Sequence, residues 1–306
     1  MADTNVIVTG ASGFLAAWLL PKLVARGHHV IAMDLKCDPA RLNQVTHGAP
    51  PAGITWQDLD VTDATACCNA VRTHMPTEII HLAALMIPAC HANPLIGVQV
   101  NLVGHMHMLE AAREAGVRLT YTSSMAAKPR GKANAPANLY GVFKRADEEI
   151  SRLYAQDFGV SSFGLRPNIV YGIGRELGAT SVITHAAKAA ALGEAYTLPW
   201  RTRAGFEYVD DMAEIFARLI DAEWDGAHVS DMSNTTSTID ELLDGLTHAA
   251  PGHRITVDDV DRLSITEGFE TASLERTIGA LPATSLAKGI AATLTHFREL
   301  QAKNML

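Results

Sequence analysis

The N-terminal segment has the pattern of a buried strand, a glycine turn, a helix and a second buried strand. Apolar residues fill Asn5–Thr9 and His29–Asp34, and a helical pattern runs between them to Ala25, just before Gly27. Parallel strands need a long crossover of this kind, whereas antiparallel strands can be joined by a short turn. The segment therefore predicts a parallel sheet and restricts the chain to folds that are built from strand–helix–strand units.

The turn of this unit has the features of a dinucleotide-binding loop. Gly10 and Gly13 let the backbone approach a pyrophosphate, and the small Ala16 allows the helix to pack closely on the sheet. The free N–H groups at the start of that helix favour an anion. Asp34, at the end of the second strand, is placed to accept the ribose hydroxyls of NAD and to repel the 2′-phosphate of NADP. This complete order favours a cofactor site over a glycine turn without a ligand.

Strand and helix patterns continue to alternate along the chain. The alternation loosens after about Asn168, so we expect a doubly wound, Rossmann-type α/β domain in residues 1–168 and a smaller, partly interleaved α/β lobe in residues 169–306. Ligands of such a sheet bind at the carboxyl ends of its strands. The predicted strands are Glu78–Leu82, Arg118–Ser123, Val160–Arg166, Ala227–Ser230 and Arg254–Val257, and the predicted helices are Ala64–His74, Pro94–Ala115, Asn138–Phe158, Thr180–Leu192, Asp210–Glu223, Ile239–His248 and Leu286–Leu300.

A tyrosine and a lysine lie four residues apart at the start of a helical pattern that continues to Tyr154. Residues i and i+4 share one face of a helix, so the Tyr140 hydroxyl and the Lys144 ammonium point into the same space. A fixed positive charge stabilises a phenolate, and such a tyrosine can exchange a proton with an alcohol or a carbonyl. Solvated Tyr–Lys pairs are common on helices, so the functional interpretation depends on the dinucleotide loop upstream.

Composition and charge argue against several classes of protein. The 306 residues carry a net charge of −8, without the basic footprint of a nucleic-acid-binding protein. No apolar run is long enough to span a membrane, and no signal-like segment precedes the first strand. The thirteen histidines lack the spacing of a metal site. No Cys-x-x-Cys pair occurs among the four cysteines Cys37, Cys67, Cys68 and Cys90, so we expect reduced thiols and a cytoplasmic protein. We also expect no bound metal.

The glycine turn resembles the Thr-Gly-x-x-Gly-Phe fingerprint of the extended short-chain dehydrogenase/reductases, the NAD-dependent epimerase/dehydratase family. Further motifs that resemble this family follow in order over roughly the first two thirds of the chain, and the ordered set is more specific than any one of them. The matching residues are Thr9-Gly10-Ala11-Ser12-Gly13-Phe14, Asp60-Val61-Thr62-Asp63, His81-Leu82-Ala83-Ala84, Asn101, Ser123-Ser124, Tyr140 with Lys144, Arg166-Pro167-Asn168-Ile169-Val170-Tyr171-Gly172 and Phe206-Glu207-Tyr208-Val209-Asp210-Asp211.

The resemblance implies NAD as the cofactor and a substrate-binding role for the lobe of residues 169–306. It implies that Ser124 holds the substrate oxygen, that Tyr140 exchanges its proton, and that Lys144 supports Tyr140 and bonds the nicotinamide ribose. The expected cofactor-binding residues are Gly10, Ser12, Gly13, Phe14, Leu15, Asp34, Asp60, Val61, Leu82, Ala83, Ala84, Tyr140, Lys144 and Pro167, and the expected substrate contacts are Met86, Ser124, Met125, Asn168, Thr180 and Ser181.

The chain departs from the nucleotide-sugar members of this family where they hold a diphosphate. Those members usually carry an arginine two residues before the phenylalanine of the run Phe206–Asp211. This chain has Ala204 there, with Arg201 and Arg203 displaced. Dehydratases normally add an acidic pair beside the catalytic Ser or Thr, where this chain has Met125-Ala126. We therefore expect a small substrate with a secondary alcohol, such as a sugar, sugar acid or hydroxy acid.

Three functions are consistent with these patterns. The first is an NAD-dependent dehydrogenase, and the second is a nucleotide-sugar epimerase that keeps its NAD tightly bound. The third, a non-catalytic NAD-sensing regulatory protein, is disfavoured because Tyr140 and Lys144 are both present. We expect a small-molecule substrate, no nucleic acid and no membrane as partners. The resemblance also implies a homodimer through Pro94–Ala115 and Asn138–Phe158, with Met106, Leu109, Ile150, Leu153 and Tyr154 as candidate contacts.

Overall fold

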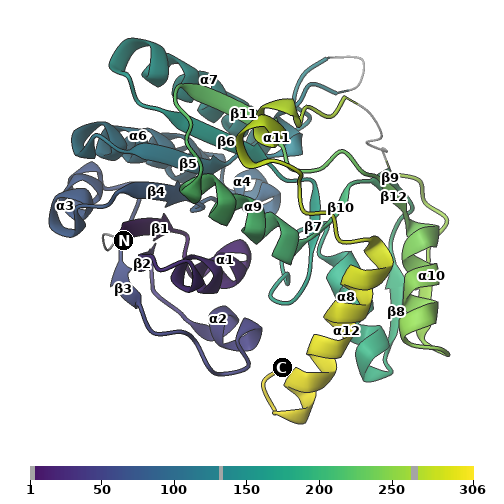
Figure 1. Ribbon diagram of the computed structural model, residues 1–306. Coiled ribbons are helices and arrows are strands. Elements are labelled where there is room, and N and C mark those ends of the chain that lie inside the picture. The colour runs from purple at the N-terminus through teal and green to yellow at the C-terminus, as the bar shows by residue number, and fades with distance from the viewer. Residues whose placement is uncertain (1–3, 131–133, 263–267) are drawn as a thin grey trace.

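A seven-stranded parallel sheet forms the centre of the computed structural model, which describes residues 4–130, 134–262 and 268–306 (Figure 1). The strand order is β11-β6-β5-β4-β1-β2-β3, so the chain starts in the middle, winds out to one edge and then builds the other. The predicted doubly wound α/β fold is confirmed. The strands are β1 Asn5–Thr9, β2 His29–Asp34, β3 Ile54–Asp58, β4 Glu78–His81, β5 Arg118–Thr122, β6 Ser162–Arg166 and β11 Ala227–Asp231.

Alternate residues of each strand point to opposite faces of the sheet. On β1, Val6 and Val8 join a buried cluster with α1 and α9, whereas Ile7 joins a second cluster with α3, α6 and α7. Helices therefore cover both faces, as a parallel sheet requires. These helices are α1 Phe14–Ala25 and α9 Val209–Asp221 on the first face, and α3 Ala64–His74, α6 Gly104–Ala115 and α7 Leu139–Phe158 on the second.

A smaller lobe packs beside the sheet around its own buried cluster, which includes Tyr171 and Ile290. Figure 1 shows α8, α10 and α12 side by side in this lobe, and α12 contacts both of the others. The elements are α8 Val182–Leu192, α10 Ile239–Ala249 and α12 Leu286–Ala302, with β7 Ile169–Tyr171 paired to β10 Phe206–Tyr208, β8 Ala195–Leu198 paired to β13 Arg254–Val257, and β9 Arg203–Ala204 paired to β12 Ser237–Thr238.

The sheet and the lobe are interleaved along the chain. The chain leaves the sheet after Arg166, builds β7 to β10, and returns through α9 to place β11 beside β6. The helix α11 (Ala272–Ile278) then packs on β11. A boundary at residue 168 thus separates β1 to β6 from the lobe, whereas β11 lies beyond that boundary and still belongs to the sheet.

The helix predicted over Pro94–Ala115 is divided into three parts. α5 (Pro94–Val98) passes into a π-helical turn, Gln99–Val103, before α6 begins. Within this turn the buried Asn101 side chain accepts a hydrogen bond from the Leu85 N–H at 2.7 Å and donates one to the Leu85 carbonyl at 2.8 Å. π-turns often occur at functional sites, and this one lets Asn101 fix the segment that follows β4.

Several short elements were not predicted from the sequence. β3 is an edge strand whose residues are only partly buried, so its apolar pattern is weak. The missed elements also include short strands of the lobe and three helices of six or seven residues, which are too short to display a helical period. The three helices are α2 Ala40–Val45, α4 Ile87–Ala92 and α11.

Two of the five apolar side chains expected at a dimer contact are unavailable for it. Leu109 is 0% exposed and Tyr154 is 9% exposed, because both belong to the cluster between the helices and the sheet. Met106 and Leu153 are 38% and 42% exposed and remain on the surface. The expectation was wrong for the two buried residues because periodicity alone does not tell the sheet-facing stripe from the outer one.

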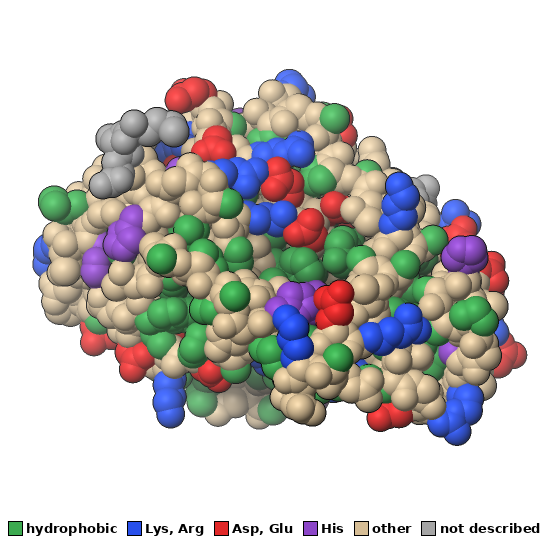
Figure 2. All heavy atoms as spheres, turned by 60° about the horizontal axis from the view of Figure 1, so that its bottom comes forward, with side chains coloured by type: hydrophobic (Ala, Val, Ile, Leu, Met, Phe, Trp, Pro, Cys, Tyr) green, Lys and Arg blue, Asp and Glu red, His purple; other side chains and the backbone are tan. Residues whose placement is uncertain are grey.

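The described residues show neither a membrane-spanning helix nor a metal site. Within residues 4–130, 134–262 and 268–306, no helix is long and apolar enough to cross a membrane, and no three metal-ligating side chains converge. All four cysteines are free thiols. On the face shown in Figure 2, acidic and basic side chains are interspersed among hydrophobic ones.

Gly289 lies inside α12 at a point where a methyl group has no room. A Cβ at this position would lie 2.0 Å from the hydroxyl oxygen of Tyr171, a fully buried side chain. We predict that Gly289→Ala lowers the free energy of unfolding by about 1–3 kcal/mol, the usual cost of overpacking. That cost exceeds the gain of about 1 kcal/mol in helix propensity. Urea unfolding measures the change.

Gly245, on the neighbouring α10, provides the matched control. A Cβ there would lie 3.7 Å from its nearest neighbour, the Ala287 Cα, which is ordinary contact. Gly245→Ala should therefore leave the stability unchanged or raise it slightly. Equal stabilities for the two variants would contradict the packing argument.

Candidate active site

The turn after β1 is built from close backbone contacts that only glycine permits. Gly10 has φ 71°, and a Cβ on it would lie 2.6 Å from the Ala83 nitrogen. Gly13 donates its N–H to the Gly10 carbonyl at 3.0 Å, and a Cβ on it would lie 2.8 Å from that same oxygen. The turn therefore lies directly against the end of β4, and the chain presents bare backbone where a dinucleotide would bind.

The helix that follows this turn offers an anion site. α1 begins at Phe14, so the N–H groups of its first turn have no acceptor within the helix. Phe14 and Leu15 are only partly buried, so this end of the helix remains accessible. The arrangement suits the pyrophosphate of a dinucleotide.

The Asp34 carboxylate lies at the end of β2, beside the turn. It accepts a hydrogen bond from the Ser12 N–H at 2.9 Å and another from the Leu35 N–H at 2.8 Å. The neighbouring cation Arg41 is engaged elsewhere, because it donates to the Ser12 carbonyl at 3.1 Å and pairs with Glu176 at 3.1 Å. The fixed negative charge at Asp34 suits the hydroxyls of an adenosine ribose.

The remaining expected cofactor residues lie at the ends of neighbouring strands. After β3, the Asp60 carboxylate accepts hydrogen bonds from the N–H and hydroxyl of Thr62, which closes the turn, and Val61 is buried against Gly104. After β4 come the half-buried Leu82, Ala83 and Ala84, and after β6 comes Pro167. The glycine turn, the acid and these strand ends lie along the carboxyl edge of the sheet, where ligands of doubly wound folds bind.

A glycine contact joins the two segments that carry the expected catalytic residues. Asn138 caps α7 by accepting the Gly141 N–H at 2.9 Å. A Cβ on Gly141 would lie 2.3 Å from the Ala126 carbonyl oxygen, so the first turn of α7 lies on the short 3₁₀ helix Met125–Ala127. That helix starts directly after Ser124, so Ser124 and Tyr140 come from two segments in backbone contact. Gly141 was not among the expected site residues, although it directly follows Tyr140 in the sequence.

The side chains of this set are held in defined environments. Tyr140 is 7% exposed and packs on Phe143 and Cys90. Lys144 is 1% exposed, and its ammonium donates a hydrogen bond to the Thr122 carbonyl at 2.8 Å. The Ser124 oxygen accepts the Ala126 N–H at 3.1 Å, and no described residue accepts the Ser124 proton. The serine hydroxyl is therefore oriented by the backbone and retains a donor for a ligand oxygen.

A buried carboxyl behind Lys144 was missed in the sequence. Asp147 lies one turn further along α7, and its Oδ2 is 3.3 Å from the Lys144 ammonium. Burial raises the pKa of Asp147 to about 7, and the positive charge of Lys144 opposes this shift. Burial likewise lowers the pKa of His81 to about 3, so the imidazole near Lys144 is neutral. The i, i+3 spacing on α7 was the available signal for Asp147.

The expected substrate contacts differ in burial and in whether their polar groups already form hydrogen bonds within the protein. Ser181 donates its hydroxyl to the Gly178 carbonyl at 2.8 Å and so closes its own turn, whereas Thr180 accepts a bond from Arg175 at 3.2 Å. The amide nitrogen of Asn168 is buried without a hydrogen-bond partner among the described residues. Met86 is half-buried at the start of α4, and Met125 is buried beside Ser124.

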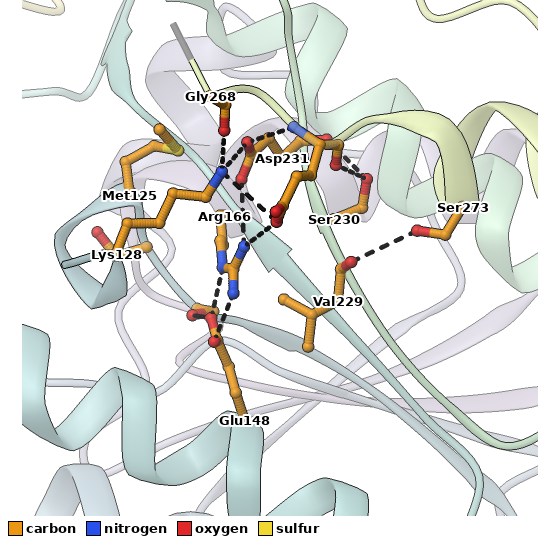
Figure 3. Close-up of polar contacts among 12 residues, drawn as sticks. Met125, Lys128, Glu148, Arg166, Val229, Ser230, Asp231, Gly268 and Ser273 are labelled. Atoms are coloured by element: carbon orange, nitrogen blue, oxygen red, sulfur yellow. Dashed lines mark hydrogen bonds and ion pairs between the residues drawn. The ribbon is translucent and has the colours of Figure 1, made fainter. Parts of the chain in front are cut away.

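A buried ion pair braces the strand ends next to Ser124 (Figure 3). Arg166, at the end of β6, donates to both oxygens of Glu148 on α7, each at 2.7 Å. Glu148 also accepts the hydroxyl of Ser123, the residue that follows β5. A two-point contact of this kind fixes the relative orientation of the two side chains and also pairs their charges. It therefore holds α7, β5 and β6 in defined relative positions beside the site.

The same cluster reaches the edge strand β11 of the sheet through its other carboxylates. Lys128 pairs with Asp231, at the end of β11, at 2.6 Å, and the Glu270 N–H donates to the same carboxylate at 2.8 Å. Arg166 completes the connection with a bond to the Glu270 side chain at 3.0 Å. The strand ends of both β6 and β11 are thus tied to the segment that leads into α11.

The position of the missing diphosphate arginine is closed. Ala204 is 0% exposed, so its side chain has no access to a ligand. Arg201 pairs with Asp240 on α10 at 2.5 Å, and Arg203 donates to the Thr236 hydroxyl at 3.2 Å. The two arginines that follow Trp200 in the sequence are thus engaged with the lobe.

Similarities to known proteins agree with this geometry. The chain matches the NAD dependent epimerase/dehydratase family over residues 6–232. It is 26% identical to the UDP-glucose 4-epimerase of Mycolicibacterium smegmatis, over 96% of this chain and 98% of that protein. Its fold is similar to that of Thermus thermophilus UDP-glucose 4-epimerase in complex with NAD (TM-score 0.78, 24% identity, 96% and 99% of the chains). It is also similar to L-threonine dehydrogenase from Clostridium difficile (TM-score 0.82, 22% identity, 98% and 99%).

The doubly wound sheet and its glycine turn define a dinucleotide-binding enzyme class. The chain belongs to the NAD-dependent epimerase/dehydratase family, and NAD is its cofactor. The resemblance stated from the sequence is therefore confirmed at the level of the family. Epimerases and threonine dehydrogenases share this fold, so the family alone does not decide between them.

We predict that Asp34 makes the protein prefer NAD over NADP by more than about tenfold, or ~1.4 kcal/mol. Asp34→Asn keeps an acceptor for the Ser12 N–H but removes the charge, so it should reduce that preference. Asp38→Asn, in the same loop, is the control, because Asp38 only caps the Ala40 N–H. Titration of protein fluorescence with each cofactor measures both affinities. Tighter binding of NADP to the wild type would refute the assignment.

We predict that Tyr140→Phe lowers turnover by about 10²–10⁴-fold, the usual loss when a general acid–base group is removed. NAD affinity should change little, because the ring and its packing remain. Lys144→Ala should lower both turnover and NAD affinity. Tyr154→Phe, on the same helix, removes only a hydrogen bond to Glu110 and should retain activity. Near-normal turnover of Tyr140→Phe would move the acid–base role elsewhere.

Proposed function

We propose that the protein is an NAD-dependent dehydrogenase that acts on a secondary alcohol of a small substrate, such as a sugar, sugar acid or hydroxy acid. The observation that supports the proposal is the contact of Gly141 with Ala126, which joins the helix of Tyr140 and Lys144 to the short helix that follows Ser124. This set supplies a hydrogen-bond donor, a proton acceptor and a fixed positive charge at the cofactor edge of the sheet.

Each residue then has one task. Ser124 donates its free proton to the substrate oxygen and orients it. Tyr140 takes the hydroxyl proton, and the buried Lys144 ammonium stabilises the phenolate that removes it. A bound NAD would supply the hydride acceptor for the carbinol carbon, and Ser124, Tyr140 and Lys144 would orient the substrate towards it. The low exposure of Tyr140 and Lys144 keeps these interactions away from water, which strengthens them.

The substrate class is inferred from the region that would hold a diphosphate. Ala204 is buried, and Arg201 is paired with Asp240. A diphosphate is usually bound by arginine because the guanidinium fork matches two oxygens at once. This arrangement supports a substrate without a nucleoside diphosphate.

The main alternative is a nucleotide-sugar epimerase that retains its NAD. It is favoured by the similarity to a UDP-glucose 4-epimerase over nearly the full length of both chains. A non-catalytic NAD sensor is the second alternative, and the complete Ser124, Tyr140 and Lys144 set disfavours it. These alternatives differ in net redox change and in their affinity for nucleotides.

The proposal is tested by following NADH formation with free sugars, sugar acids and hydroxy acids, including L-threonine. We expect steady NADH formation with at least one of them and none with UDP-glucose. Calorimetry on the NAD-loaded protein should give a Kd of about 1 mM or weaker for UDP, GDP and dTDP. Micromolar binding of any of the three, or an epimerised product without NADH release, would replace the proposal with the epimerase.

We also propose that two copies of the chain associate through α6 and α7. Figure 1 shows these helices side by side on the outer side of the sheet. They expose apolar side chains that no described residue covers fully, namely Met106 at 38%, Leu139 at 42%, Val142 at 46%, Leu153 at 42% and Phe158 at 52%. Apolar stripes on paired helices suit a two-fold, four-helix contact.

We predict that sedimentation will show a dimer for the wild type at micromolar concentration and a monomer for Leu153→Glu, because a buried charge opposes association. Val260→Glu is the control, since Val260 is 55% exposed in the lobe, away from these helices. A monomeric wild type, or an unchanged dimer in Leu153→Glu, would contradict this assembly.

A further inference from the structure

Arg175 is a largely buried cation that has no counter-ion among the described residues. Its Nη2 donates to the Thr180 hydroxyl at 3.2 Å, and its Nε is buried with no hydrogen-bond partner among the described residues. None of the ion pairs formed within residues 4–130, 134–262 and 268–306 includes it. Arg166 differs in this respect, because its guanidinium is met by both oxygens of Glu148.

An uncompensated buried charge is costly, and proteins usually pair such a group. Burial lowers the pKa of Arg175, and the nearby Tyr140 acts in the opposite direction. An anion that binds beside Tyr140 would supply both the missing charge and an acceptor for Nε.

The loop that carries Arg175 is fixed against the cofactor turn. The Trp18 indole N–H of α1 donates to the Ile173 carbonyl at 3.0 Å, and a Cβ on Gly174 would lie 3.5 Å from the Phe14 ring. Arg41 adds a bridge to Glu176 at 3.1 Å. These contacts make the loop a preorganised support, so little ordering is needed when an anion binds.

The guanidinium lies beside the first residue of the helix that follows the cofactor turn. Its carbon is 5.7 Å from the centre of the Phe14 ring. The loop follows β7, which belongs to the lobe, whereas a pyrophosphate already has the glycine turn and the start of α1. This placement favours an anion on the substrate over one on the cofactor.

We propose that Arg175 binds a carboxylate of the substrate, which narrows the substrates to hydroxy acids, including sugar acids and hydroxy amino acids. This inference rests on the proposed function, because it assumes that the substrate reaches Tyr140. The guanidinium fork matches a carboxylate in two-point contact, with Nε as one of the donors. Neutral sugars lack the group that this site requires.

The test is direct binding to the full chain saturated with NADH, which cannot oxidise an alcohol. Calorimetry compares L-threonine, 3-hydroxybutyrate and gluconate with their primary amides. The variants are Arg175→Met, which removes the charge, and Arg175→Lys, which keeps it without the fork. Lys188→Met is the matched control. Lys188 is a second cation that, like Arg175, lines a small cavity next to the loop. The NADH affinity and thermal unfolding of each variant are measured alongside.

We expect the acid that binds best to the wild type to lose about 10- to 100-fold in affinity in Arg175→Met, the equivalent of a charge-assisted hydrogen bond of roughly 1.5–3 kcal/mol. The acid affinity of Arg175→Lys should lie between those of the wild type and Arg175→Met. The acid affinity of Lys188→Met should match that of the wild type. The amide should bind all four proteins equally weakly. NADH affinity should stay within about twofold of the wild type.

Three results would overturn the inference. Loss of NADH affinity in Arg175→Met with unchanged acid binding would assign the arginine to the pyrophosphate. Equal loss for acid and amide would make it a structural residue. No binding of any acid to the wild type at millimolar concentration would exclude a carboxylate site. A failure of the proposed function is separate, because it appears as absent NADH formation even when carboxylates bind.

Discussion

The interaction on which the site depends most is the buried contact between Arg166 and Glu148. It joins the end of β6 to the middle of α7, and Ser123 adds the end of β5 through the same carboxylate. Removing Arg166 would leave the Glu148 carboxylate buried without a cation among the described residues, which is far more disruptive than losing a surface pair. Since Ser124 follows Ser123 and Tyr140 opens α7, the relative position of the proposed catalytic groups is set by this pair together with the Gly141 contact.

The electrostatic pattern of the site distinguishes structural cations from a ligand-binding one. Arg166 and Lys128 are satisfied by carboxylates of the chain itself. Among the described residues Arg175 has one neutral partner, the Thr180 hydroxyl, although its loop is as firmly supported. The closed position at Ala204 and the uncompensated charge of Arg175 support the proposed small, carboxylated substrate.

The predictions from sequence worked where the physical signal is local. Alternating strand and helix patterns predicted the fold, and the ordered set of short motifs predicted the family, because each of these signals depends on residues close together in the chain. Arg175, Asp147 and the π-turn around Asn101 escaped notice because their roles depend on groups brought together by folding. The same limit explains the error over Leu109 and Tyr154, since a helix pattern shows an apolar stripe but not which neighbour covers it.

The place of β11 in the sheet has a consequence for how the chain folds. The edge of β6 stays unpaired until residues 227–231 join it, after the chain has passed through most of the smaller lobe. Pairings between strands so distant in sequence are slow to form, and an exposed strand edge is prone to association with other chains. The N-terminal part of the chain emerges first during synthesis, yet it cannot complete its sheet on its own. A truncation before β11 would therefore expose β6, and the two lobes should acquire their native structure together rather than one after the other.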